Sequence, residues 1–376
     1  MKITAGLGSI DEYIKFVKAG ADEFFCGYVP YSWAKKYGTV MPLNRREVFC
    51  YNVQLGSYSE LEILSAMIKR YGKPVHLTFN SLYYIPQQYP EIAEIIQNCM
   101  KLGFQSYIIA DPALIIYLRN QGIDCDIHLS GEMGEINSRA VEMLQRQKLK
   151  RIIFHRKNTF EDMESVIRSE RAAGVTRAQT EFEAFALNEM CQFSGAFCNS
   201  LHCDELGYLC RVPYQLKKIR NDYSYRMDDV CSNIQRNDMD KCIANNRMSE
   251  NSSDHIVSDH MSGSASHNYS GSDILYDGPD GIDEEADDWT ERYDDTGYLC
   301  GETGCGLCAL YQLQKAGITH LKLVGRGNYT DFMEKDIRNL RQALNILADN
   351  RIETEFIQQM KQTLFPKGCS GNCYYR

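Results

Sequence analysis

Short apolar runs of β-forming residues alternate with longer amphipathic stretches through most of this 376-residue chain. The expected strands are Lys2–Ala5, Glu23–Gly27, Val75–Asn80, Ser106–Asp111, Asp126–Ser130, Arg151–His155, Glu181–Phe185 and His320–Val324. Helical spacing marks Ser9–Ala19, Ser57–Tyr71, Glu91–Leu102, Asn137–Gln147 and Phe160–Ala173 between them. Such alternation is typical of a parallel sheet covered by helices on both faces. Because the expected strands number eight, we predict an α/β fold, a closed (β/α)8 TIM-like barrel.

One segment, Asn221–Arg292, breaks this rhythm. It is rich in Ser, Asn, Asp and Gly, and it carries 17 acidic and 5 basic residues. The net charge of −9 therefore belongs to this segment, and the rest of the chain is nearly neutral. Such a composition buries too little apolar surface to offset the entropy of ordering. We predict a disordered acidic insertion between strands 7 and 8, a discontinuous barrel domain at 1–220 and 293–350, and a cysteine-containing tail at 351–376.

The chain shows no secretory signal at its start, and no apolar run is long enough to cross a bilayer. We therefore expect a cytoplasmic protein without a membrane partner. Fifteen cysteines in a long intracellular chain indicate metal or redox chemistry rather than a disulfide framework. No basic patch with interleaved aromatic residues marks a nucleic-acid surface, so a nucleic-acid partner is not indicated.

The chemistry of a (β/α)8 barrel lies at the carboxyl ends of its strands. That rule nominates Cys26, Asn80, Asp111, His128, Ser130, Glu132, His155, Arg156, Glu183 and Arg326. We expect His128 and His155 to transfer protons near neutral pH, and Glu183 to orient a neighbour or bind substrate hydroxyls. Arg156 and Arg326 would bind a carboxylate or phosphate through their guanidinium groups.

The cysteines are concentrated around the insertion and near the end of the chain. The dense groups comprise Cys191, Cys198, Cys203 and Cys210, then Cys300, Cys305 and Cys308, and finally Cys369 and Cys373. Four thiolates together select zinc or an iron–sulfur cluster. Only Cys305 with Cys308, and Cys369 with Cys373, have the close spacing of structural zinc ligands. The irregular spacing of the others suits a cluster held inside a folded domain.

Four stretches of the chain resemble the peptidase U32 family. The run Glu183–Cys198, EAFALNEMCQFSGAFC, resembles the signature of that family, with Asn188 where the family usually has Gly. The other similar stretches are Gly20–Gly27, Ile127–Asn137 with Arg151–Arg156, and Gln314–Arg326. The likeness covers nearly everything except the acidic insertion and the tail. We expect Asn137, in one of these stretches, and Asn80, at the end of its strand, to bind substrate.

The resemblance implies more than one kind of activity. The family is named for collagenase-like proteolysis, yet members also support oxygen-independent hydroxylation of ubiquinone precursors, transfer-RNA uridine and ribosomal-RNA cytidine. Those members are associated with a [4Fe–4S] cluster, and for some of them prephenate is implicated as the hydroxyl source. The family pattern implies cluster ligands at Cys191, Cys198, Cys210 and Cys308, with Cys203 as an alternative to Cys210. Cys300, Cys305, Cys369 and Cys373 lie outside that pattern and could hold a second metal or form a redox pair.

Three functions are compatible with the sequence. The first is an iron–sulfur protein that supports oxygen-independent hydroxylation, or a related modification, of a small-molecule, RNA or peptide substrate through a [4Fe–4S] cluster at the barrel mouth. The second is a peptidase, in which Cys191 would pair with His128 or His155, although the chain has neither a Gly-x-Ser-x-Gly nor a His-Glu-x-x-His motif. The third is a non-catalytic, cluster-bearing subunit that works with a second U32-type chain.

Overall fold

The structure is a computed structural model, and it describes residues 1–38, 40–45, 53–134, 136–172, 180–191, 198 and 292–375. All of these residues belong to one compact unit of the chain. The insertion expected at 221–292 lies outside the described residues except for Arg292.

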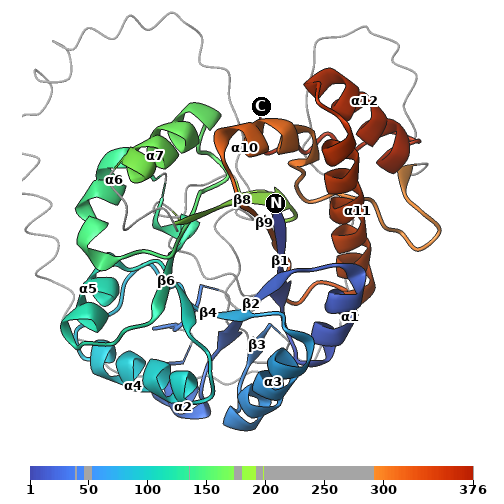
Figure 1. Cartoon of the computed structure of the whole chain (residues 1–376). Coiled ribbons are helices and arrows are strands. Elements are labelled where there is room, and N and C mark those ends of the chain that lie inside the picture. The colour runs from blue at the N-terminus through green and yellow to red at the C-terminus, as the bar shows by residue number, and fades with distance from the viewer. Residues whose placement is uncertain are drawn as a thin grey trace, which may run out of the picture. The chain divides into compact units, whose positions relative to one another are not determined.

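Eight parallel strands form a closed barrel, as the sequence predicts, and helices surround it (Figure 1). The barrel strands are β1 (Lys2–Leu7), β2 (Glu23–Tyr28), β4 (Val75–Phe79), β5 (Ser106–Ile109), β6 (Asp126–Leu129), β7 (Arg151–Ile153), β8 (Glu181–Leu187) and β9 (His320–Leu323). Each strand pairs with the next, and β1 pairs with both β2 and β9, which closes the barrel. A two-residue strand, β3 (Gln54–Leu55), adds to β2 outside the closed ring.

The helices follow the strands in the order typical of this fold. They are α1 (Asp11–Ala19), α2 (Tyr31–Tyr37), α3 (Tyr58–Tyr71), α4 (Gln88–Lys101), α5 (Pro112–Asn120), α6 (Ser138–Met143), α7 (Phe160–Ala172), α10 (Leu310–Ala316), α11 (Thr330–Asp349) and α12 (Glu353–Leu364). Local chemistry sets several of their ends. Ser57 and Glu60 form a capping box at the start of α3, and Asp111 caps α5 with Pro112 in the first turn. No helix among the described residues is long and apolar enough to cross a membrane.

Alternate residues of each strand face two different environments. One set is apolar and packs under the helices, as Ile127 and Leu129 do on β6. The other set faces the barrel interior, and there many residues are charged or polar, for example Glu183 on β8 and Lys322 on β9. Above these charges a small apolar layer of Phe25, Ile108, Ile153 and Phe185 separates the interior from the mouth of the barrel.

The segment predicted as a tail contains helix α12 and a final stretch that folds back onto the barrel. Its backbone pairs with the loop before α10 through Cys305 and Cys373. Tyr374 and Tyr375 then reach the carboxyl end of β8, where their hydroxyls donate to the carbonyls of Asn188 and Phe185. The end of the chain therefore forms part of the barrel mouth.

Candidate functional site

A pocket lies at the carboxyl ends of the strands and encloses about 70 Å³, room for a group of a few heavy atoms. Its lining residues come from seven of the eight barrel strands or from the loops that follow them. They are Phe25, Arg45, Thr78, Asn80, Ile108, Ser130, Gly131, Glu132, Ile153, Arg156, Phe185, Glu189, Lys322, Val324 and Arg326. The sequence predictions Asn80, Ser130, Glu132, Arg156 and Arg326 are thus brought together in one cavity.

Cationic side chains dominate this pocket. Arg45 forms an ion pair with Glu132 at 3.1 Å. The Arg326 guanidinium donates to the Val53 carbonyl at 3.3 Å and to the Thr78 hydroxyl at 3.5 Å. Arg45, Arg326 and a third guanidinium, that of Arg156, are all at least nine-tenths buried. Buried guanidinium groups facing a small cavity favour a carboxylate or phosphate ligand.

A glycine makes the position of Arg326 possible. Gly27 ends the interior face of β2, and a Cβ atom added there would collide with the Arg326 Nη1. Any other residue at position 27 would push the guanidinium away from the pocket.

Arg156 is held by aromatic and acidic neighbours. Its guanidinium lies 4.0 Å from the centre of the Phe185 ring. Burial alone would lower the pKa of Arg156, but the acidic groups of Tyr374, Glu132, Glu189 and Cys191 around it raise that pKa. The guanidinium therefore remains charged despite its burial.

Lys322 connects the pocket to the charges beneath it. Its Nζ donates to Glu183 at 2.9 Å and lies 3.7 Å from the centre of the Phe25 ring. Burial lowers the pKa of Lys322, and the negative charge of Glu183 partly opposes that effect. Burial would raise the pKa of Glu183, but Lys322 and Arg151 hold it at about 2. Glu183 is therefore ionised and lies at the floor of the pocket rather than at its rim.

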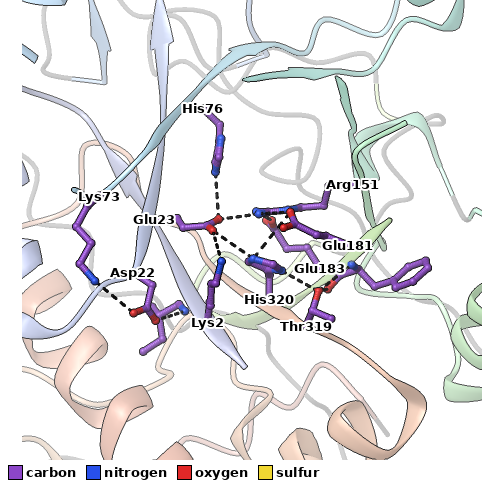
Figure 2. A network of polar contacts seen from close by, with 12 residues as sticks. Lys2, Asp22, Glu23, Lys73, His76, Arg151, Glu181, Glu183, Thr319 and His320 are labelled. Atoms are coloured by element: carbon purple, nitrogen blue, oxygen red, sulfur yellow. Dashed lines mark hydrogen bonds and ion pairs between the residues drawn. The ribbon is translucent and has the colours of Figure 1, made fainter. Parts of the chain in front are cut away.

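Figure 2 shows the network below this floor, centred on Glu23 and Arg151. The Arg151 guanidinium contacts the carboxylates of Glu23, Glu181 and Glu183 at 2.7 to 2.8 Å. Glu23 also accepts from His76 at 3.1 Å, and Lys2 extends the network at the opposite end of the barrel. Burial would raise the pKa of Glu23, but hydrogen bonds from the histidines and the charge of Arg151 hold it well below its usual range.

The two predicted proton-transfer histidines do not line the pocket. His128 lies inside the barrel, with its ring centre 4.5 Å from that of His76. Burial, followed by the positive charges of His76 and Arg151, lowers the pKa of His128 well below its usual value, so it stays neutral. His155 is fully buried behind β7, where its Nδ1 accepts from the backbone of Lys157 at 3.3 Å.

Three other nominated residues have local structural contacts. Asn137 is exposed and caps α6 by accepting from the backbone of Arg139 and Ala140. Asp111 caps α5 and accepts from Tyr84 at 3.1 Å. Cys26 is buried in the apolar core between the barrel and the helices, and burial raises its pKa to about 12.

The described cysteines implied by the family pattern fall into two places. Cys198 lies beside the pocket, because its carbonyl accepts from the Arg45 guanidinium at 2.9 Å. Cys191 lies within electrostatic reach of Arg156. Cys308 lies instead within electrostatic reach of Cys369 and Cys373.

Cys203 and Cys210 lie outside the described residues. The thiolate is the type of ligand that binds iron–sulfur clusters. In the part of the chain that the structure describes, however, no three His, Cys, Asp or Glu side chains surround a common ion position.

The turn before Cys191 explains one departure from the family pattern. Asn188 and Glu189 both have left-handed backbone conformations, with φ of 70° and 55°. Asn tolerates this conformation better than most residues other than Gly. The Asn188 amide also donates to the buried carboxylate of Asp336 at 2.7 Å, which fixes the turn.

Several residues of the site escaped the sequence analysis. Lys322, His76 and Glu23 lie within the strands, where a charged residue at every second position of an apolar run is the signal of a polar barrel interior. Arg45 and Tyr374 come from irregular segments far from the strand ends they reach, so no pattern in the sequence marks them.

Comparison with known proteins supports the same family. The family model described as "Peptidase family U32" matches residues 8–375. No curated protein sequence matches the chain. Among solved structures, "The Structure of the U32 Peptidase Mk0906" is similar at 13% identity and a TM-score of 0.37, over 50% of this chain and 68% of that chain. Because the family model covers almost the whole sequence, the chain belongs to peptidase family U32.

Proposed function

We propose that this U32 protein binds a [4Fe–4S] cluster beside the pocket and supports oxygen-independent hydroxylation, or a related modification, of a substrate with an anionic group. One observation carries the proposal. Two arginines of the pocket, Arg45 and Arg156, contact or lie within electrostatic reach of the segment that bears Cys198 and Cys191. The backbone of Cys198 and the thiol of Cys191 therefore lie near the arginines of the pocket.

The pocket residues have separate tasks in this proposal. Arg156 and Arg326 bind the carboxylate or phosphate of a small molecule, a nucleoside or a peptide. Glu132, paired with Arg45, limits the net positive charge and orients that guanidinium. Lys322 is the member of the buried network that lines the pocket, so it is placed to hold a proton near the bound group.

The cluster would be held by Cys191 and Cys198, with Cys210 and Cys308 as the remaining ligands that the family pattern implies. When bound, it would supply one-electron chemistry to the pocket. A second U32-type subunit would complete the site if the chain binds the cluster but turns over no substrate alone.

The ligand assignment is tested by anaerobic purification of Cys191→Ala and Cys198→Ala. We expect each variant to lose about four irons and four acid-labile sulfides relative to the wild type, because each lacks one thiolate of the set. Cys99→Ala is the matched control, since Cys99 lies on α4 and is buried in the apolar core. Full iron content in both pocket variants would remove the assignment, and a metal-free protein that cleaves peptides would favour the thiol peptidase.

The pocket assignment is tested by ligand-induced thermal stabilisation under anaerobic conditions. A panel of small carboxylates and phosphomonoesters is compared on the wild type, on Arg156→Gln and on Arg139→Gln. We expect stabilisation of the wild type and of the exposed control Arg139→Gln, and at least a tenfold weaker response in Arg156→Gln. An equal response in all three proteins would contradict a binding role for Arg156.

A further inference from the structure

Two segments far apart in the sequence bring four cysteines together. Cys305 and Cys308 precede α10, and Cys369 and Cys373 follow α12. Cys305 and Cys373 are direct partners in an isolated parallel β-bridge. The Cys305 N–H donates to the Asn372 carbonyl at 2.8 Å, and the Tyr374 N–H donates to the Cys305 carbonyl at 2.8 Å.

Further polar contacts hold the two segments in this arrangement. The buried Ser370 hydroxyl donates to the Gly301 carbonyl at 2.7 Å. Arg292 donates to the Cys369 carbonyl at 3.1 Å. Gly301 has a φ of 67°, and a Cβ atom there would lie 2.7 Å from the Cys305 Cβ. The backbone therefore wraps closely around Cys305, which only glycine permits at this position.

Cys305 and Cys308 lie within electrostatic reach of each other and of both Cys369 and Cys373. Burial raises the pKa of Cys305 to about 12, and the neighbouring Cys308, Cys373 and Cys369 contribute in the same direction. Cys308 likewise interacts with Cys373 and Cys369. All four carry free thiols in the structure.

We propose that Cys305, Cys308, Cys369 and Cys373 form a tetrathiolate metal centre, which takes either Zn²⁺ or an iron–sulfur cluster. Two close pairs, with two and three residues between partners, have the spacing of such sites. In the structure, no three of these side chains surround one point. Metal binding would therefore bring the thiols closer together, on a backbone in which Cys305 and Cys373 already join the two segments. Each thiol loses its proton to solvent as the metal binds.

This centre gives Cys308 a different task from the one implied by the family pattern. Cys308 would complete the C-terminal set rather than the set near Cys191 and Cys198, whose remaining ligands would then be Cys203 and Cys210. The two centres are therefore independent, and the inference does not rest on the proposed hydroxylation.

The centre also has a structural consequence for the pocket. Tyr374 follows Cys373 directly, and its ring packs against the apolar layer that contains Phe185. The centre of that ring lies 6.0 Å from the Arg156 guanidinium. A metal bound by Cys373 would hold this wall of the pocket in place.

The experiment measures zinc, iron and acid-labile sulfide in the anaerobically purified full chain and in three double variants. These are Cys305→Ser with Cys373→Ser, Cys191→Ser with Cys198→Ser, and the control Cys99→Ser with Cys125→Ser, whose cysteines lie in the apolar core. We expect the first variant to lose about one zinc, or about four irons and four sulfides, relative to the control. The second variant should keep that complement.

X-ray absorption on the Cys191→Ser, Cys198→Ser protein keeps the proposal testable if the first variant does not fold. We expect a zinc with four sulfur neighbours at about 2.3 Å, or the spectrum of an iron–sulfur cluster. Zinc and cluster are distinguished by the sulfide content. A protein with no bound metal, or disulfide pairing of these four cysteines in the anaerobic wild type, would overturn the proposal. If the wild type holds metal at the C-terminal centre but no cluster at Cys191 and Cys198, the proposed function is overturned and this proposal stands.

Discussion

Glu183 shows how this barrel uses charge in its interior. It has no exposed surface, and its two oxygens contact Lys322 and Arg151 at 2.9 and 2.8 Å. A buried ion pair is costly to desolvate, so its partners depend on one another. These contacts hold Lys322 in a fixed position, where it lines the floor of the cationic pocket.

Replacing this carboxylate should destabilise the protein strongly. We expect Glu183→Gln to lower the free energy of unfolding by about 3 kcal/mol, because Arg151 and Lys322 would remain buried with less compensating charge. Urea unfolding measures the effect. The exposed pair of Glu142 with Arg139 provides the control, and Glu142→Gln should cost less than about 0.5 kcal/mol. Equal losses in the two variants would mean that the network contributes no more than a surface ion pair.

The buried histidines make stability depend on pH. Burial lowers the folded-state pKa of His76 and His128 below their ordinary value of 6.5. The unfolded chain therefore binds more protons, and stability is fully present above about pH 6.5 and falls as the pH decreases below it. Asp336 acts in the opposite sense, because burial raises its pKa to about 6, so its contribution to stability is larger below that pH.

The net effect of these groups can be measured between pH 7.5 and 5. Two histidines against one aspartate should lower the free energy of unfolding by about 1 kcal/mol per pH unit below pH 6. His128→Asn should flatten this slope, and Asp336→Asn should steepen it. A flat profile in the wild type would show that the histidines take up protons without unfolding the barrel.

At the scale of secondary structure, the strands were predictable and the loops were not. All eight strands were located from their apolar runs, because each packs one face under the helices. His128 and Glu183 lie below the rim at which the sequence predicts them, because both are inward-facing positions within their strands and are buried in the barrel interior. The path of the C-terminal segment depends on hydrogen bonds such as that from Ser370 to Gly301, which no local pattern reveals.

The C-terminal segment should contribute to stability through Tyr374. Its hydroxyl donates to the Asn188 carbonyl at the turn before Cys191. We expect Tyr374→Phe to lower the free energy of unfolding by about 1 to 2 kcal/mol, since the carbonyl loses a buried donor. Tyr311→Phe is the matched control, because the Tyr311 hydroxyl donates to an exposed backbone carbonyl. No difference between the variants would argue against this link between the tail and the barrel mouth.

For the whole molecule, the closed barrel accounts for the arrangement of the site. Strands β8 and β9 are direct neighbours, although the insertion separates them in the sequence. The segments carrying Cys198 and Arg326 thus meet at one pocket with the loop carrying Arg45. The family and the fold could be predicted from the sequence. The ligand set could not, because the path of the cysteine-rich loops depends on tertiary contacts.

The central claim is that a thiolate-bound cluster lies beside the cationic pocket. The most direct measurement is the iron and acid-labile sulfide content of the anaerobically purified wild type, with optical spectra before and after exposure to air. We predict a broad visible absorption that air bleaches, and about four irons and four sulfides per chain more than in the Cys191→Ser, Cys198→Ser protein. A colourless protein that contains zinc alone, or no metal, would contradict the claim.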